Sequence, residues 1–502
     1  HHSLRRGRRR PDREQRHPHD DAPRAAGGGW PRAARRSPGC RAHGGRGQPA
    51  GAGAETVGTE TGASAGAGAG TSPSGGAAAG TENAPGAGAG VGASAQPEGS
   101  QPEGSQPGET RPELTGEPIR IGAIYALSGN NAAIGTNILR GIDLAVEDIN
   151  QSGGVNGRPI EIIRGDTQGD PAVGKALAEE LITKEQVHAI VGCHQSTLTE
   201  TVAQVCEEYH IPMITAISTV DSITAHHYEY AFRLCPMNSL YLENMFMYMR
   251  DQAEKTGHKV KTIAVFADNS MIGQEAIRCA RIYAPQYGME IVTEIQYGQG
   301  AADLTKEIRE LKEADADAVL AESYVSDAIL LMKTMKALDY QPPILIAKAN
   351  GFADPSFIPG VEGISNGVTS VVEWNPDLTK GQDTNRRFKE IFGIDMNGHS
   401  AEAYTAIWTL KTAFEEAGSD DGEAVKDALA ALDIQGSFPG GPEIILPYDR
   451  IKFENHVFNG SMYTNDNIYA SVAIAQIQDG EYKTVWPFEY SSQEIVYPPA
   501  YD

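Results

Sequence analysis

The chain has 502 residues, of which 22% are charged, and a formal net charge of −24 at pH 7. Residues 1–50 nevertheless hold 13 Arg, no Lys and four acidic residues, so the acidic excess lies in the rest of the chain. Nucleic-acid-binding proteins gather Lys and Arg on one face, and a membrane-spanning helix needs about 18 to 20 consecutive apolar residues. The strongly acidic remainder of the chain disfavours nucleic acid as a partner, and the absence of such an apolar run excludes an integral membrane protein.

Residues 1–117 lack the aliphatic side chains that a folded core requires. An Arg-rich head is followed from residue 51 by a Gly, Ala, Ser, Thr, Pro and Glu spacer, in which GAGAG recurs before QPEGSQPEGSQPGE. We expect this region to be disordered, because burial there cannot offset the entropy of ordering. No secretory signal is recognisable. Cys40, after Ser37, Pro38 and Gly39, is the candidate for a lipid anchor, and the long spacer is typical of a tether at a cell surface.

From residue 118 onward, apolar segments alternate with segments of helical periodicity. The predicted strands are 119–126, 160–165, 188–192, 212–216, 261–267, 290–297, 318–323, 344–348 and 367–372. Continuous apolar strands between amphipathic helices predict an α/β fold, with parallel sheets covered on both faces. About 385 residues exceed one core of the usual size, so two lobes are expected.

Polar side chains follow several predicted strands of the first half. These are Ser128 after the first strand, Gln195, Ser196 and Thr197 after the third, and Ser218 and Thr219 after the fourth. Ligands of parallel sheets collect at such strand ends, and the start of a helix favours an anion such as a carboxylate. The alternative for Ser196 is simple N-capping with Glu200 nearby. The agreement of two neighbouring strand ends favours an anion site.

The strand ends of the second half are also polar. They carry Asp268, Asn269 and Ser270, then Glu322, Ser323 and Tyr324, and finally Lys348, Ala349 and Asn350. We expect them to form the opposite wall of the same site. The alternatives are a helix cap for Asp268 and a half-buried aromatic ring for Tyr324. No Gly-Lys-Ser/Thr or GxGxxG motif follows the first strand, which disfavours a nucleotide.

The sequence offers weak material for catalysis. His194, Ser196 and Asp221 would make a Ser-His-Asp set, but no GxSxG turn exposes the serine. HExxH is absent, and the His226–His227 pair has no third metal ligand in view. We therefore expect no catalytic residue, no metal and no cofactor. The four cysteines of this part, Cys193, Cys206, Cys235 and Cys279, have no metal spacing and are expected to be buried, with one disulfide left open.

The order of IGAIYALSGNNAAIG, GIDLAVEDINQSGGVNGRPIEIIRGD, HQSTLT, PMITAISTVDSIT, FRLCP, IAVFADNSMIGQ, ESYVSDAILLMKTMKAL and AYTAIW resembles the type I periplasmic binding proteins. The nearest subgroup is the branched-chain amino acid and amide binding proteins of ABC transporters. The resemblance covers nearly all of residues 118–502. It implies two Rossmann-like lobes joined by a three-crossing hinge, an extracytoplasmic location, an ABC permease as partner and no enzymatic activity. A monomer is expected.

The resemblance also implies roles for single residues. A ligand carboxylate would meet Ser196 with Thr219 in reach, and an amino group would meet the carbonyl of Ile217, the Thr219 hydroxyl and an acidic residue of the second lobe. Tyr324 would cover the ligand, and His399 would line the side-chain pocket. The implied lobes are 118–238 with 371–460, and 239–370 with 461–502.

This sequence departs from the family pattern at three places. Ile272 and Ile134 stand where the family has aromatic residues, so the pocket is expected to be aliphatic on those sides. The acidic residue for an ammonium should fall near Ala349 or Asn350, where none exists. Either Glu322 supplies that charge or the ligand lacks an ammonium, and Lys348 could recruit a second anion. The ligand is therefore an amino acid of aliphatic type or, alternatively, a small amide, urea or carboxylate, and a ligand-sensing module of the same fold is the other alternative.

Overall fold

The computed structural model describes residues 112–502, except for the side chains of Ala349 and Asn350. The predicted Arg-rich head and Cys40 lie outside the described residues. Residues 112–117, which the sequence assigns to the spacer, contact the folded part of the chain. The Thr115 N–H donates to the Gly157 carbonyl at 3.1 Å, and the guanidinium of Arg158 donates to the Glu117 carbonyl at 2.6 Å.

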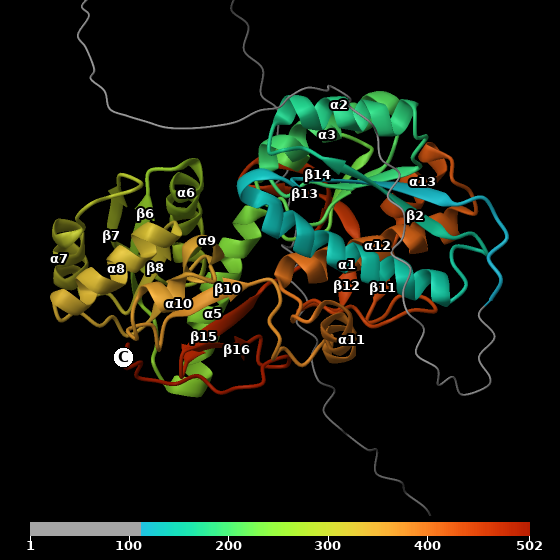
Figure 1. Ribbon diagram of the computed structural model, residues 1–502. Coiled ribbons are helices and arrows are strands. Elements are labelled where there is room, and N and C mark those ends of the chain that lie inside the picture. Colours follow the sequence, from blue (N-terminus) through green and yellow to red (C-terminus); the bar gives the residue numbers. More distant parts are fainter. Residues whose placement is uncertain (1–111) are drawn as a thin grey trace, which may run out of the picture. The chain divides into compact units, whose positions relative to one another are not determined.

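The described residues form two seven-stranded sheets, each the centre of one lobe (Figure 1). The sheet of the N-terminal lobe has the order β13-β14-β5-β4-β3-β1-β2. Its strands are β1 (Ile119–Tyr125), β2 (Ile160–Asp166), β3 (Ala189–Gly192), β4 (Met213–Thr215), β5 (Ala231–Arg233), β13 (Phe453–Phe458) and β14 (Ser461–Asn467). All neighbours are parallel except β13 and β14, and Ile121 of β1 lies opposite Ile162 of β2 and Ala189 of β3.

The sheet of the C-terminal lobe has the order β16-β15-β10-β9-β8-β6-β7. Its strands are β6 (Thr262–Asp268), β7 (Glu290–Tyr297), β8 (Ala318–Glu322), β9 (Leu345–Ala347), β10 (Thr369–Val372), β15 (Ala473–Gln478) and β16 (Glu481–Trp486). The five strands from β6 to β10 are parallel, whereas β15 and β16 are antiparallel additions at one edge. A separate two-stranded sheet joins β11 (Ile434–Gln435) and β12 (Arg450–Ile451).

Helices cover both faces of each sheet. In the N-terminal lobe they are η1 (Gly129–Asn131), α1 (Ala132–Gln151), α2 (Pro171–Thr183), α3 (Ser196–Tyr209), α4 (Ser222–Ala225), α11 (Gln382–Phe392), α12 (Gly398–Ala417) and α13 (Gly422–Ala431). In and beside the C-terminal lobe they are α5 (Asn238–Thr256), α6 (Met271–Gln286), α7 (Thr305–Ala314), α8 (Val325–Ala337), α9 (Ala349–Phe352) and α10 (Phe357–Gly360).

Alternation along β1 divides the N-terminal core into two layers. Ile121 and Ala123 pack with residues of α1 and α12, whereas Ile124 packs with residues of α2 and α3. In the C-terminal lobe, Val265 of β6 faces α5 and α6, and its neighbour Phe266 faces α7 and α8. This two-sided burial explains why the strands read as continuous apolar runs.

The chain crosses between the sheets three times. It leaves β5 through α5 to reach β6, returns after β10 towards α11 and α12, and passes from β14 to β15. The expected α/β fold with two lobes and a three-crossing hinge is confirmed. The predicted boundary at 460/461 is wrong, because β14 pairs with β5 in the N-terminal sheet. The boundary at 370/371 is also misplaced, because β10 belongs to the C-terminal sheet as far as Val372.

All nine predicted strands exist, with ends that differ by no more than two residues. β5 and β11 to β16 were missed. The four cysteines of the described residues are buried and free, as expected, so the disulfide left open from the sequence does not form.

Candidate functional site

The first turn of α3 forms the centre of the candidate site. Gln195 holds the cap position in an extended conformation, and its side chain does not cap the helix. The simple capping alternative for Ser196 is therefore wrong, because Ser196 is the first helical residue rather than the cap. A helix leaves its first amides without partners inside the helix, and they attract an anion together with the helix dipole. Ser196 is half-buried and Thr197 is exposed, so both remain reachable.

Ser218 joins the two loops that follow β3 and β4. Its Oγ lies 2.9 Å from the carbonyl oxygen of Cys193 and 3.1 Å from that of His194, and 2.5 Å from the hydroxyl of Thr199. Only 1% of Ser218 is exposed. The hydroxyl thus holds the loops together, and we omit Ser218 from the proposed ligand contacts. Its bonds explain why Ser196 and Thr219, which are far apart in the sequence, are positioned by one framework.

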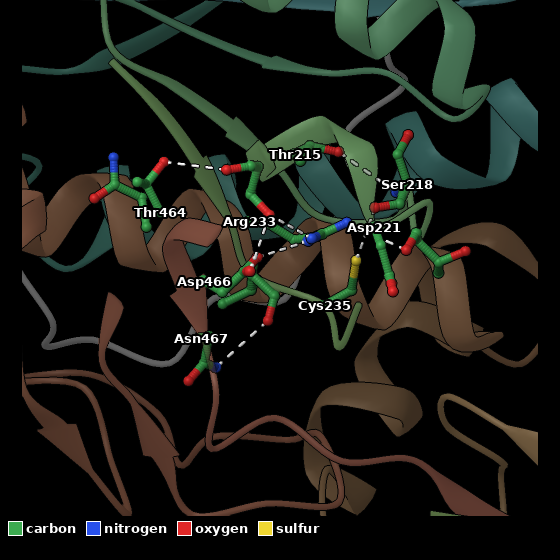
Figure 2. Close-up of polar contacts among 12 residues, drawn as sticks. Thr215, Ser218, Asp221, Arg233, Cys235, Thr464, Asp466 and Asn467 are labelled. Carbon is green, nitrogen blue, oxygen red and sulfur yellow. Dashed lines mark hydrogen bonds and ion pairs between the residues drawn. The ribbon is translucent and has the colours of Figure 1, made fainter. Parts of the chain in front are cut away.

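A buried ion pair joins Arg233 and Asp466 (Figure 2), and it fixes the backbone at Thr219. Arg233 is fully buried, and its Nε donates to Asp466 Oδ1 at 2.8 Å. Its Nη1 donates to the carbonyls of Thr219 at 3.2 Å and Val220 at 2.6 Å. The Asn238 N–H donates to the same Thr219 carbonyl at 2.7 Å. The Thr219 side chain is half-buried, whereas the predicted contact residue Ile217 is buried.

The predicted contacts of the C-terminal lobe lie at the ends of β6 and β8. Ser270 caps α6 by accepting from the Gly273 N–H at 3.2 Å, and Ile272 is half-buried in the first turn. A side chain at Gly273 would stand 2.1 Å from the Asp268 carbonyl, so only glycine permits this turn. Tyr324, at the cap position of α8, is 36% exposed. The side chain of Asn350, another predicted contact, lies outside the described residues.

Lys348 is already neutralised inside the protein. Its Nζ lies 3.9 Å from Glu322 Oε2 and contacts Asn238 Oδ1, and both Lys348 and Glu322 are nearly inaccessible. The Asn238 amide in turn contacts Glu275. We therefore discard the possibility that Lys348 recruits a second anion, and Glu322 uses its charge on Lys348.

Two histidines meet where the loop after β3 touches the start of α12. The ring centroids of His194 and His399 are 5.2 Å apart in an edge-to-face arrangement. Burial lowers the pKa of each ring to about 4, and His399 itself contributes to the shift of His194. Both rings are therefore neutral at pH 7. His399 is half-buried, and its contact with His194 places it beside the loop that leads to Ser196.

The residues of the imagined Ser-His-Asp set are not connected. His194 faces His399, whereas Asp221 accepts from the Ser239 N–H at 3.1 Å and lies 3.7 Å from Arg278. Within residues 112–502, no hydrogen bond joins His194 to Ser196 or to Asp221, and no group of three potential metal ligands occurs. His227 bonds the Met462 carbonyl instead.

Two carboxyl groups near the hinge, those of Glu373 and Glu402, were not among the site residues predicted from the sequence. Glu373, directly after β10, accepts from the Tyr241 hydroxyl at 3.0 Å. Glu402, on α12, is 2% exposed, and its Oε2 has no partner among the described residues. Burial, reinforced by Glu373, raises the pKa of Glu402 well above its usual range. The signal for Glu373 was available, since it is a polar residue at the end of an apolar strand.

A family model described as periplasmic binding protein matches residues 118–464. The chain belongs to the periplasmic binding proteins. The Leu/Ile/Val-binding protein homolog 7 of Brucella suis is 28% identical over 394 residues, which are 76% of this chain and 94% of that protein.

Solved structures share the fold of this periplasmic binding protein. An ABC transporter substrate-binding protein from Sphaerobacter thermophilus is 24% identical, with a TM-score of 0.60 and coverage of 73% of this chain and 96% of that one. LivJ from Streptococcus pneumoniae, a branched-chain amino acid transporter substrate binding protein in complex with isoleucine, is 19% identical, with a TM-score of 0.57 and coverage of 73% and 99%.

The two positions at which the resemblance leads us to expect aromatic residues keep accessible surface in this periplasmic binding protein. Ile134, just after the start of α1, and Ile272 of α6 are both half-buried. Ser128 is exposed at the turn after β1, where Asp166 accepts from the Leu127 N–H at 2.8 Å. None of the helices within residues 112–502 has the length and apolar character of a membrane span.

Proposed function

We propose that this protein is the substrate-binding component of an ABC importer and captures a small aliphatic α-amino acid between its lobes. It acts outside the cytoplasm as a monomer, catalyses no reaction and delivers the ligand to a membrane permease. The observation that carries this proposal is the first turn of α3, which begins at Ser196 without a side-chain cap and whose loop is tied through Ser218 to the loop that holds Thr219. That combination suits a carboxylate.

The side chains around this anion site favour an aliphatic ligand. Ile134 and Ile272 replace aromatic residues of the family, and both keep accessible surface. Burial of a small aliphatic side chain against such residues contributes about 1.5 to 3 kcal/mol. The names of relatives, such as the Leu/Ile/Val-binding protein homolog and the isoleucine complex of LivJ, agree with this ligand class.

The two lobes suggest how capture proceeds. The N-terminal lobe offers Ser196 and Thr219 as the initial contacts. Movement about the three crossings then brings Ile272 and Tyr324 over the ligand, and the permease recognises the closed form. A ligand shifts this equilibrium only through contacts that it makes better in the closed state.

Thermal unfolding of the full chain tests the ligand class. We expect leucine, isoleucine or valine to raise the melting temperature, because a ligand at 100 times its Kd stabilises the native state by about 2.7 kcal/mol. Acetamide, urea and 4-methylpentanoate serve as the amide, urea and carboxylate comparisons. A shift with one of these compounds and with no amino acid would contradict the proposed ligand class.

Removal of the Ser196 hydroxyl tests the anion site. Ser196→Ala is expected to weaken leucine binding about 10- to 100-fold in a calorimetric titration, since a hydrogen bond to a charged group contributes about 1.5 to 3 kcal/mol. Thr201→Ala is the matched control, because its hydroxyl bonds the Thr197 carbonyl one turn further along α3. Equal affinities of both variants would exclude this placement of the carboxylate.

Loss of the Tyr324 ring tests the closing lobe. Tyr324→Ala is expected to weaken binding about 10-fold, mainly through faster dissociation, because the contact exists only in the closed state. Stopped-flow measurement of leucine release gives the rate. A slower association with unchanged release would place Tyr324 in the initial encounter instead.

A further inference from the structure

We propose that Glu373, at the crossing between β10 and the N-terminal lobe, is the carboxylate that receives the ammonium group of the ligand. This inference rests on the proposed function and assigns a residue that the family resemblance does not supply. The resemblance places an acidic residue near Ala349 and Asn350, but this sequence has none there. The other candidate is Glu322, whose Oε2 lies 3.9 Å from Lys348 Nζ.

The position of Glu373 fits this role. It follows Val372, the last residue of β10, and the hydroxyl of Tyr241 from α5 holds its Oε1 at 3.0 Å. Glu373 and Tyr241 therefore both belong to segments that cross between the lobes. An added Cβ at Gly398 would stand 2.7 Å from Glu373 Oε2, which places the carboxylate beside the first residue of α12. Glu373 is half-buried, so a ligand can reach it.

The same place adjoins the proposed carboxylate site. His399 follows Gly398, and its ring contacts His194, two residues before Ser196. Glu373 and His194 influence each other electrostatically. An α-amino acid carries its two charged groups on one carbon atom, so an ammonium site must adjoin the anion site. Glu373 meets this requirement from the hinge side.

Glu373 has no cation at salt-bridge distance among the described residues, and Lys348, which acts on it electrostatically, is held by other groups. Lys348 contacts Glu322 and Asn238, and Arg278 lies 3.2 Å from Glu275 and 3.7 Å from Asp221. Among residues 112–502, Glu373 takes part in no ion pair, and its Tyr241 bond is to a neutral hydroxyl. A half-buried carboxylate without a counter-charge loses part of its hydration, and an ammonium group offsets that penalty.

Glu402 is a second carboxyl group beside Glu373, and we infer that the two together carry one negative charge. It lies four residues after Gly398, hence one turn inward on the same face of α12. It is 2% exposed and its Oε2 points to no partner among the described residues. Two neighbouring buried carboxyl groups do not both ionise readily, so the more deeply buried Glu402 keeps its proton. Burial also raises the pKa of Glu373, but the Tyr241 bond and Lys348 oppose this shift, so Glu373 is the group of the two that carries a negative charge to match one ammonium.

A comparison of two probes on the full chain tests the assignment. L-Leucine and 4-methylpentanoate share the carboxylate and the side chain, but only leucine has the ammonium. We expect Glu373→Gln to weaken leucine binding by about 30-fold or more, the usual effect of removing one partner of a desolvated charge pair, and to leave 4-methylpentanoate within about 3-fold of the wild type. Gln preserves the shape and accepts the Tyr241 bond.

Two variants serve as controls. Glu390→Gln changes an exposed carboxylate that pairs with Arg386, and Glu402→Gln replaces a neutral carboxyl group by a neutral amide. Both are expected to retain leucine affinity within about 3-fold. The unliganded melting temperature of Glu373→Gln verifies that the variant is folded.

The outcomes separate the two proposals. If the wild type binds an amino acid and Glu373→Gln binds it equally well, the assignment of Glu373 fails while the proposed function stands. Equal losses for leucine and 4-methylpentanoate would also overturn it, because Glu373 would then act on the whole site rather than on the ammonium. If the wild type binds no amino acid, the proposed function fails and takes this inference with it.

Discussion

Asp466→Ala is expected to lower the free energy of unfolding by about 3 to 5 kcal/mol, because it leaves the charge of Arg233 buried without its partner. Arg233 is fully buried and Asp466 is 2% exposed. The second carboxylate oxygen, Oδ2, accepts from Thr224 at 2.9 Å and contacts His456 at 2.7 Å, so the substitution removes several bonds together. Denaturant unfolding measures the loss.

The matched control is Asp383→Ala. Asp383 also pairs with an arginine, Arg386, at 2.6 Å, but its side chain is 76% exposed. Exposed pairs contribute about 0 to 1 kcal/mol, so this variant should unfold near the wild-type midpoint. If the two variants unfolded at the same denaturant concentration, the buried pair would not have the energetic role assigned to it.

The same pair predicts a pH dependence of stability. Burial tends to raise the pKa of Asp466, but Arg233 and the His456 bond outweigh this effect, and the pKa is lowered. The unfolded carboxyl group titrates near 4, above the folded value. The stabilisation is therefore complete above about pH 4 and is lost as the pH falls through the lower pKa of the folded state. Asp466→Ala should lack this part of the acid-induced loss.

Gly141→Ala is expected to destabilise the protein by about 1 to 3 kcal/mol or more, because α1 and α12 touch at this glycine. An added Cβ would stand 2.1 Å from the Ser400 carbonyl oxygen and 2.9 Å from the Ser400 Cα, and neither is a flexible side-chain atom. The two helices must separate. Alanine is the better helix former by about 1 kcal/mol, so a net loss would show that the contact dominates.

A second glycine provides the control for Gly141→Ala. A Cβ at Gly298 meets no atom within 4 Å, and Gly298→Ala should leave the unfolding midpoint nearly unchanged. The Gly141 variant should also bind leucine more weakly, since Ser400 lies next to His399 at the start of α12. Unaltered stability of Gly141→Ala would mean that α12 can shift without cost.

The fold could be predicted from the sequence because its central strands are buried on both faces and read as apolar runs. β13 and β14 were not predicted, because their sequences, FENHVF and SMYTNDN, contain no apolar run. The last two residues of β14 are polar but buried: Asp466 accepts from Arg233, and the Asn467 amide donates to the Leu234 carbonyl at 3.4 Å. A strand stabilised by buried polar bonds has no apolar periodicity to detect.

The candidate site was predictable only where residues follow strands. Ser196 and Thr219 were selected by that rule, and Glu373 also obeys it after the run VTSVV. Tyr241 does not, because it lies in the first turn of α5, where nothing in NSLYLENMF distinguishes a residue that faces the hinge. Ser218 was predicted as a ligand contact, but its hydroxyl bonds backbone carbonyls. Position at the end of a strand does not reveal whether a hydroxyl faces a ligand or a neighbouring carbonyl.

Because β14 pairs with β5, the N-terminal sheet can be completed only late in translation. Arg233 is synthesised early, but Asp466, its only carboxylate partner at hydrogen-bond distance among residues 112–502, emerges more than 230 residues later. The C-terminal sheet likewise waits for β15 and β16, which come last. Pairings between such distant segments form slowly. Neither lobe can therefore be completed during translation until nearly the whole chain has been made, and a nascent chain stopped before residue 461 would leave both sheets unfinished.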